Sequence, residues 1–417
     1  MANVSSSNGL EKRPKLRFPG FDEPWKETTL SALFSKSTQK NADGHITNVI
    51  CNSAKLGLIP QREYFDKDIA NSDNTSGYYI IRQNDFVYNP RKSSDAPYGP
   101  ISSYKYAEEG IVSPLYLCFH AIGEINPLYY EWYFRSSAWH RYIYMSGDSG
   151  ARHDRVSIKD DTFFAMPINL PSEQEQSKIA SFLQSLDERI AAQEKLVASL
   201  KKYKRGLLRA YFVTDNWKSQ GTWSKCKLGA CCSKIGSGKT PKGGSSVYAN
   251  QGIMFLRSQN VLWGTLDISE VSFIDEATNS TMQSSEVRFG DVLLNITGAS
   301  IGRSCIYTSN DRANVNQHVC IIRLSQESKE RLLPEFLLQQ ILSDRIQQQV
   351  MDCQNGGSRE GLNFQQIADF NIVIPEMEEQ RKICGMLKAF DQKLCNEEIS
   401  LKALFSLRTS LMQQLFI

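Results

Sequence analysis

The chain has 417 residues, a length that allows about two to three domains, each able to bury a hydrophobic core. Its composition is that of an ordinary globular protein, and a net charge of +3 does not by itself indicate a nucleic-acid-binding protein. No apolar run is long enough for a membrane span, and the ten cysteines show neither zinc-site spacing nor a disulfide framework. Composition therefore predicts a cytoplasmic protein with no membrane partner. Any nucleic-acid surface must come from local clustering of charge.

The chain begins with a polar tail, residues 1–17, which ends in several basic residues and is predicted to be disordered. Residues 18–170 follow as a first body, in which short apolar runs alternate with turn residues. Pro127 marks the first turn of a helix in this body. The apolar runs predicted as strands are Tyr78–Ile81, Phe86–Tyr88 and Val112–Phe119.

Residues 171–212 are predicted to form one long helix, because apolar residues recur there with a heptad period. Two seam positions of the heptad carry the apolar residues Ile179, Leu183, Leu186, Ile190, Val197, Leu200, Leu207 and Tyr211. About 40 helical residues span roughly 60 Å, which is longer than an ordinary domain helix requires. The helix is therefore interpreted as a spacer.

A polar linker, residues 213–222, leads to a second body at residues 223–374 and a second long helix at residues 375–417. The strands predicted in the second body are Ile253–Leu256, Val292–Leu294, Cys305–Tyr307 and Val319–Leu324, and Pro334 opens its helix. The second helix repeats the first without a gap at its start, where Glu175, Gln176 and Ile179 recur as Glu379, Gln380 and Ile383. The chain is thus an internal duplication.

These patterns predict an α+β chain with two mainly antiparallel β bodies that contain few helices. The two long helices would join the bodies and pair as an antiparallel coiled coil. Gln193 and Glu397 interrupt the two heptads at matching places. In an antiparallel pair they could meet, hydrogen-bond and fix the register. The alternative is that both residues reach solvent at the edge of the seam.

The stretch Gly236–Thr240 resembles the end of a phosphate-binding loop. The full motif needs a glycine where this chain has Ser233, and Pro241 disfavours the helix that should follow. Nucleotide binding is therefore not expected. A loop that carries Lys239 and Lys242 suits a DNA phosphate backbone, and a solvated surface loop is the alternative.

Other polar residues follow predicted strands or glycine-rich turns and are candidates for DNA contacts, since arginine commonly reads guanine and asparagine or glutamine reads adenine. A surface or structural role is the alternative for each. These candidates are Arg91, Lys92, Arg152, Arg257, Gln259, Asn260, Arg303, Asn316 and Arg359. No catalytic or metal-binding constellation of residues stands out in the sequence.

The duplicated layout resembles the specificity subunit of type I restriction-modification systems. The resemblance is carried by Leu16–Phe21 with Trp25, by Gly150–Arg152, and by the starts of the two long helices, Leu170–Gln176 and Ile374–Gln380. It implies that each body reads one half of a split, asymmetric DNA site. It also implies that the paired helices set the gap between the halves. The basic run Lys201–Gly206 fits the resemblance too, but the second helix lacks an equivalent run.

The resemblance further implies partners: double-stranded DNA, two modification subunits that methylate adenine, and, where present, motor–nuclease restriction subunits. S-adenosylmethionine, ATP and Mg²⁺ would bind to those partners, and this chain would hold no cofactor and catalyse no reaction. The alternative function is a helix-mediated assembly protein with two β-rich ligand-binding bodies and no DNA role. An enzyme is a third and weaker hypothesis.

Overall fold

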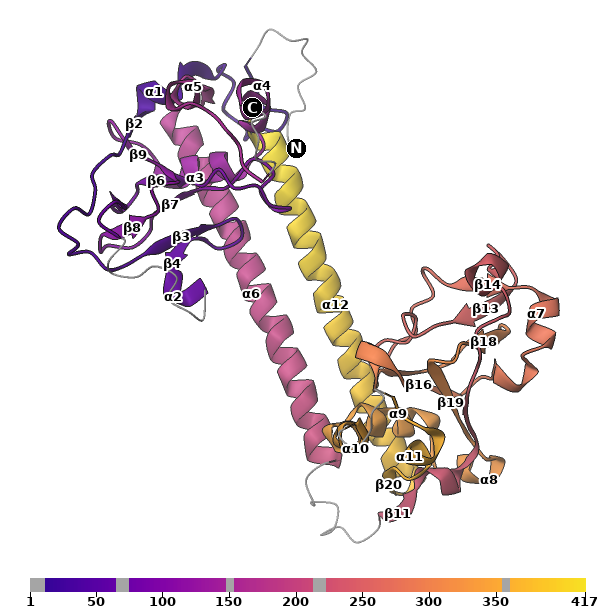
Figure 1. Cartoon of the computed structure of the whole chain (residues 1–417). Helices are drawn as coiled ribbons and strands as arrows, with labels where there is room; N and C mark the ends of the chain where they lie inside the picture. The colour runs from indigo at the N-terminus through magenta and orange to yellow at the C-terminus, as the bar shows by residue number, and fades with distance from the viewer. Residues whose placement is uncertain (1–11, 65–74, 148–153, 213–222, 355–360) are drawn as a thin grey trace. The chain divides into compact units, whose positions relative to one another are not determined.

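The computed structural model describes residues 12–64, 75–147, 154–212, 223–354 and 361–417 (Figure 1). The chain divides into two compact units: unit 1 comprises Met1–Glu194 and Ile399–Ile417, and unit 2 comprises Lys195–Glu398. The predicted domain boundaries stay a prediction, and the predicted linker lies outside the described residues. Among the helices that are described, none combines the length and apolarity of a membrane-spanning segment.

The central sheet of unit 1 has four strands, all paired antiparallel, in the order β2-β9-β6-β7. These strands are β2 (Phe34–Lys36), β9 (Leu117–Ala121), β6 (Phe86–Tyr88) and β7 (Ile101–Ser103). Smaller antiparallel pairs are β1 (Lys26–Thr29) with β10 (Pro167–Leu170), β3 (Ile50–Ser53) with β4 (Gly57–Pro60), and β5 (Tyr79–Ile81) with β8 (Gly110–Val112). The predicted strand Val112–Phe119 is wrong as one element, because a turn closed by Tyr116 N and Ser113 O separates β8 from β9.

The helices of unit 1 are α1 (Leu30–Leu33), α2 (Gln61–Tyr64), α3 (Pro127–Arg135), α4 (His140–Ser146), α5 (Asp160–Phe164), the first part of α6 (Glu173–Phe212) and the last part of α12 (Met377–Leu415). Helix α3 starts where Pro127 predicted it, and the Asn126 side chain caps it by accepting from Tyr129 N. It packs against the sheet, and rings from both layers, such as Phe86 and Phe134 at 5.6 Å, fill the core.

Unit 2 contains a second antiparallel sheet with the order β12-β19-β16-β17. A further sheet, β14-β13-β18-β15, includes one parallel pair between β13 and β18. The strands are β11 (Ser224–Lys227), β12 (Cys232–Ser237), β13 (Ile253–Leu256), β14 (Ser272–Ile274), β15 (Glu286–Val287), β16 (Val292–Asn295), β17 (Ser304–Ile306), β18 (Ala313–Val315), β19 (Val319–Leu324) and β20 (Asn371–Ile374). Strand β11 pairs with β20. The prediction of mainly antiparallel bodies is therefore confirmed.

Helices cover one side of unit 2. Here α9, α10 and α11 gather beside α12, whereas β13, β14 and α7 lie on the far side of β16 and β19 (Figure 1). The helices of this unit are the last part of α6, α7 (Glu276–Ser280), α8 (Gln326–Lys329), α9 (Pro334–Leu342), α10 (Asp344–Gln354), α11 (Phe364–Ala368) and the first part of α12 (Met377–Leu415). Short 3₁₀ turns are η3 (Leu228–Cys231), η4 (Gly244–Val247), η5 (Gln283–Ser285) and η6 (Gly298–Ser300).

The duplication predicted from the sequence is present in the structure around the start of each long helix. In each unit, a strand that follows a tryptophan pairs with the strand that precedes the long helix. In unit 1, Trp25 Nε1 donates to Glu175 Oε2 at 3.2 Å. In unit 2, Trp223 Nε1 donates to Glu379 Oε2 at 2.9 Å. The two bodies are thus joined to their helices in the same way.

The predicted disordered tail needs a correction for residues 12–17, which pack onto unit 1. The Arg17 guanidinium donates twice to the Glu175 carboxylate, at 2.7 and 2.8 Å. Leu16 N also donates to Gln414 O at 3.0 Å. An ion pair with a buried carboxylate orders this segment, which composition alone did not reveal.

The long helices pack antiparallel within each unit. In unit 1, Arg408 pairs with Asp187, and Leu183 shares a hydrophobic core with Leu415.

In unit 2, Lys201 Nζ lies 2.6 Å from Glu398 Oε1, and Lys204 pairs with Asp391. As the residue numbers of these contacts rise along α6, the numbers of their partners on α12 fall, as in an antiparallel coiled coil. Of the proposed register pair, Gln193 belongs to unit 1 and Glu397 to unit 2. Their contact stays a prediction.

Candidate nucleic-acid interface

Four loops of unit 2 come together where strands end. Asn316, after β18, joins two of them, since its carbonyl accepts from Gly238 N at 3.1 Å and its N–H donates to Leu256 O at 3.1 Å. Ile296 N, after β16, donates to His318 O at 3.0 Å. We call these segments the unit 2 loop cluster, which consists of residues 238–240, 257–260, 296–303 and 316–318.

Gly238 allows two of these loops to touch. A Cβ atom on this residue would lie 1.6 Å from the Val315 carbonyl oxygen, so the backbone of β18 excludes any side chain here. Gly236 and Ser237 belong to strand β12, and Thr240 is followed by a turn. The stretch that resembled a phosphate-binding loop is thus a strand end with a packing glycine.

Two of the predicted base-contacting residues hold the loops in shape. Asn260 is buried; its Oδ1 accepts from Arg257 N at 3.0 Å and its Nδ2 donates to Asp267 O at 2.9 Å. Asn316 is also buried, and its Oδ1 accepts from His318 N at 3.0 Å. Both residues therefore shape the backbone of their loops, and their direct contact with bases stays a prediction.

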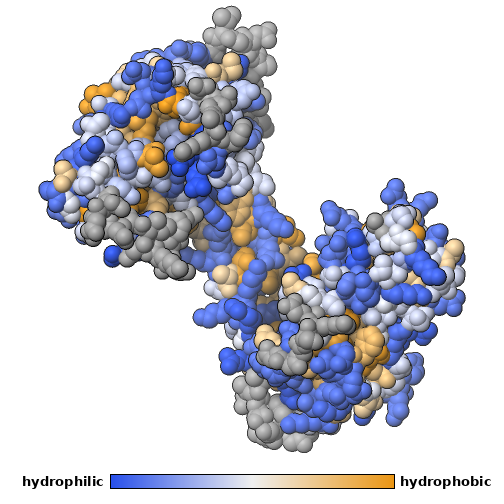
Figure 2. All heavy atoms as spheres, in the orientation of Figure 1, coloured by the Kyte–Doolittle hydropathy of each residue, from blue (hydrophilic) through white to orange (hydrophobic). Residues whose placement is uncertain are grey.

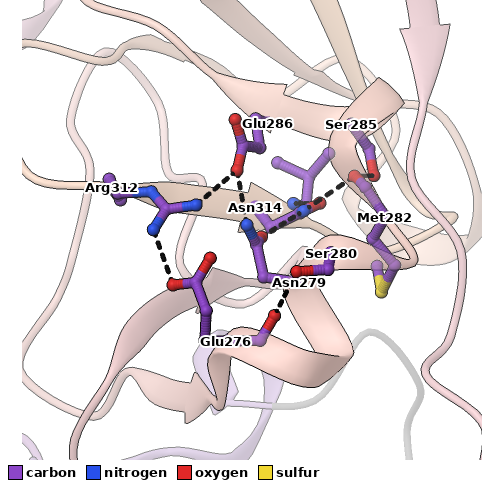
Figure 3. Close-up of polar contacts among 9 residues, drawn as sticks. Glu276, Asn279, Ser280, Met282, Ser285, Glu286, Arg312 and Asn314 are labelled. Carbon is purple, nitrogen blue, oxygen red and sulfur yellow. Dashed lines mark hydrogen bonds and ion pairs between the residues drawn. The ribbon is translucent and has the colours of Figure 1, made fainter.

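A separate polar network links α7 to the sheet that contains β15 and β18 (Figure 3). Asn314 Nδ2 donates to Asn279 Oδ1 at 2.8 Å, and Arg312 bridges Glu276 and Glu286 at 2.6 and 2.9 Å. The hydrogen bond from Asn279, together with Arg312, lowers the pKa of Glu286 below its usual value. The charge of Arg312 is compensated there, and this network ties α7 and β15 to β18.

The remaining candidates in unit 2 are exposed or half-buried. Lys239, Lys242 and Gln259 are exposed, and Arg257 and Arg303 are half-buried. The guanidinium carbon of Arg257 lies 5.5 Å from the ring centre of Tyr248. Within the described part of the chain, none of the four cations forms an ion pair; these are Lys239, Lys242, Arg257 and Arg303. They provide uncompensated positive charge beside exposed amides, as a DNA surface requires.

In unit 1, Arg91 and Lys92 lie in the loop after β6, and both are exposed. This loop corresponds to the loop after β16 in unit 2. Arg91 and Lys92 line a surface groove of about 620 Å³ together with Lys55 and Arg155. The backbone of Arg91 bridges to that of Arg155, and in unit 2 Thr297 bridges to Gly361 in the same way. Sequence reasoning did not single out Lys55 and Arg155, and the duplication offered no signal for Arg155, whose counterpart in unit 2 is Gly361.

Sequence reasoning also left out Thr240 and Thr297, which take part in a hydrogen-bonded chain with Gln317 and His318. Polar loop residues of this kind are too common for their spacing to single them out. Arg152 and Arg359, predicted as phosphate clamps or base readers, lie outside the described residues.

The geometry suits binding. Burial raises the pKa of the thiols of Cys118 and Cys305 to about 12, so these groups stay protonated at neutral pH and are poor nucleophiles. Among the described residues, no group of three or more histidine, cysteine or acidic side chains could hold a metal ion.

Hydrophilic residues dominate the visible face of each unit (Figure 2). Cations and amides on strand-end loops can contact phosphates and base edges.

Two solved structures share this fold. One comes from a study of complex assembly and conformational transition of the type I R-M system; its TM-score is 0.63 at 16% identity, with 95% of this chain and 98% of that chain covered. The other is the S subunit of a type I restriction-modification system from M. genitalium; its TM-score is 0.56 at 16% identity, with 97% and 99% covered.

Sequence comparison gives the family. The chain is 23% identical over 244 residues to the specificity subunit of the type I restriction enzyme MjaVIII from Methanocaldococcus jannaschii, a match that covers 55% of this chain and 56% of that relative. The match thus spans little more than half of the relative. The family model for the type I restriction modification DNA specificity domain matches twice, at residues 29–202 and 221–403. The chain, with two such domains, therefore belongs to the type I restriction-modification DNA specificity family.

Proposed function

We propose that this chain is the DNA-recognition subunit of a type I restriction-modification complex. Each unit would read one half of a bipartite, asymmetric DNA site through its strand-end loops. The observation that carries the proposal is the repeated loop position after β6 and β16, which holds different polar residues in the two units. Two unlike surfaces on a repeated scaffold match a site with two unlike halves. The long helices would set the gap between them.

The proposed complex adds two modification subunits, and restriction subunits where cleavage takes place, in the cytoplasm. Those partners would bind S-adenosylmethionine, ATP and Mg²⁺ and carry out methylation and cutting, while this chain contributes recognition. Support for the partners comes from family membership. The alternative, an assembly protein without a DNA role, is not favoured by the family match.

Exchanging residues 223–374 for the second body of another specificity subunit is expected to change one half-site and leave the other unchanged. The reason is that the loop cluster of unit 2 is built from its own residues. Mapping of methylated adenines in cells that express the exchanged chain with its modification subunits checks this. The reciprocal exchange of residues 18–170 is the control, and it should alter the other half. Changes in both halves after either exchange would contradict independent reading.

Replacing Lys239 or Arg303 with alanine is expected to weaken DNA binding about equally for all sequences. Each change should also reduce the slope of log K against log salt by about one, because one phosphate contact and its released counterion are lost. Titrations of the full complex with labelled DNA at several salt concentrations measure the slope. Lys329→Ala, an exposed change on α8, is the matched control. No DNA binding by the wild-type complex at any of these salt concentrations would favour the assembly alternative.

A further inference from the structure

A chain of side-chain hydrogen bonds crosses the unit 2 loop cluster and holds one exposed amide. Thr240 Oγ1 donates to Gln317 Oε1 at 2.6 Å, and Gln317 Nε2 lies 2.9 Å from His318 Nε2. His318 Nδ1 is hydrogen-bonded to Thr297 Oγ1. The residues come from the loops after β12, β16 and β18, so three loops fix the orientation of the Gln317 side chain.

The placement of the Gln317 amide sets the direction of the hydrogen bonds in this chain. An amide nitrogen can only donate, so His318 Nε2 is the acceptor and the ring proton sits on Nδ1. Nδ1–H then donates to Thr297 Oγ1. Gln317 is left with one unused N–H on Nε2 and one unused lone pair on Oε1.

Gln317 is exposed, whereas Asn316 before it is buried and His318 after it is half-buried. An exposed glutamine ordinarily samples many rotamers, and a partner that binds it must overcome this entropy. Here Thr240 and His318 have already oriented the amide. Gln259, in the neighbouring loop, is exposed as well, but no described side chain holds its amide in this way.

We infer that Gln317 reads an adenine in the major groove of the half-site bound by unit 2. The free N–H and lone pair match the N7 acceptor and N6 donor of adenine, which is the usual bidentate partner of a glutamine amide. Thr240, His318 and Thr297 are positioning residues. The inference rests on the proposed function, because it assigns one base contact within the loop cluster that the proposal already places on DNA.

The first test uses the full chain assembled with its modification subunits and maps the methylated adenines. Gln317→Ala is expected to relax one A·T position in the half-site read by unit 2, with discrimination at that position falling about tenfold or more. The other half-site should stay unchanged. Gln326→Ala is the matched control, since Gln326 is an exposed glutamine on α8 at the opposite end of β19, and it should leave the site unaltered.

The second test separates positioning from folding. Thr240→Val keeps the shape of the side chain but removes the hydroxyl that donates to Gln317, whereas Thr240→Ser keeps the hydroxyl. Thr240 is exposed, so neither change should disturb the core. Thr240→Val is expected to relax the same A·T position as Gln317→Ala, and Thr240→Ser to retain discrimination there.

The outcomes distinguish the inference from the proposed function. A wild-type complex that recognises no bipartite site would overturn the proposed function, and the inference with it. If the wild-type complex recognises such a site but Gln317→Ala reads it with unchanged discrimination, or relaxes a G·C position, only the role of Gln317 is overturned. Equal behaviour of Thr240→Val and Thr240→Ser would remove the positioning role of Thr240.

Discussion

Gly238→Ala is expected to destabilise unit 2 by about 3 kcal/mol and to disrupt recognition of the half-site proposed for this unit. The added Cβ would lie 1.6 Å from the carbonyl oxygen and 2.6 Å from the carbonyl carbon of Val315. Both atoms belong to the backbone of a buried strand, so no rotamer change relieves the clash. The loop must move away, and the hydrogen bond from Gly238 N to Asn316 O is then lost. Thr240 moves with the loop.

Gly236→Ala is a close control for this change. The nearest atom to a Cβ there is Lys234 Cε at 4.0 Å, which is an ordinary contact. We expect this variant to unfold at nearly the wild-type temperature and to keep the wild-type DNA site. Thermal unfolding followed by circular dichroism, together with methylation mapping, compares the two. Equal stability of the two variants would show that the loop does not rest on β18.

Glu175→Gln is expected to destabilise unit 1 by about 3 kcal/mol, because it removes the counter-ion of a nearly buried arginine. The side chains of Arg17 and Glu175 are 11% and 1% exposed, respectively. Glutamine can still accept one hydrogen bond, but the Arg17 guanidinium then lacks a charged partner out of water. Residues 12–17 should detach from the unit. Denaturant unfolding measures the loss, and hydrogen exchange in the β1–β10 pair assigns it to unit 1.

The duplication supplies a matched comparison in Glu379→Gln. Glu379 accepts from Trp223 Nε1 at 2.9 Å, but it is half-buried and pairs with no arginine among the described residues. We expect this change to cost about 1 kcal/mol or less, as for one neutral hydrogen bond. A loss as large as that for Glu175→Gln would show that the charge of Arg17 is not the cause.

Features with a local pattern could be predicted from the sequence. The heptads placed α6 and α12, and apolar runs placed β6, β13, β16 and β19 close to their observed bounds. Strand β12 was missed because Gly236 and Gly238 read as a loop. Its strand character comes from pairing with β19, far along the chain.

The candidate site was predicted only in part. Exposed cations such as Lys239 and Arg91 could be chosen by residue type and position. The burial of Asn260 and Asn316 could not be predicted, since an asparagine that shapes a turn and one that reads a base look alike in sequence. The bracing of Gln317 by Thr240 depends on loops that meet only after the sheets form.

Unit 1 is discontinuous along the chain, and this has a consequence for the order of events during synthesis. Residues 399–417 belong to it, and the ring of Phe416 lies 5.7 Å from that of Tyr129 and 6.2 Å from that of Tyr133. Unit 2 is one continuous stretch, Lys195–Glu398. The body made first on the ribosome therefore completes its core last, when residues 399–417 have emerged, after every residue of unit 2 is already available for folding.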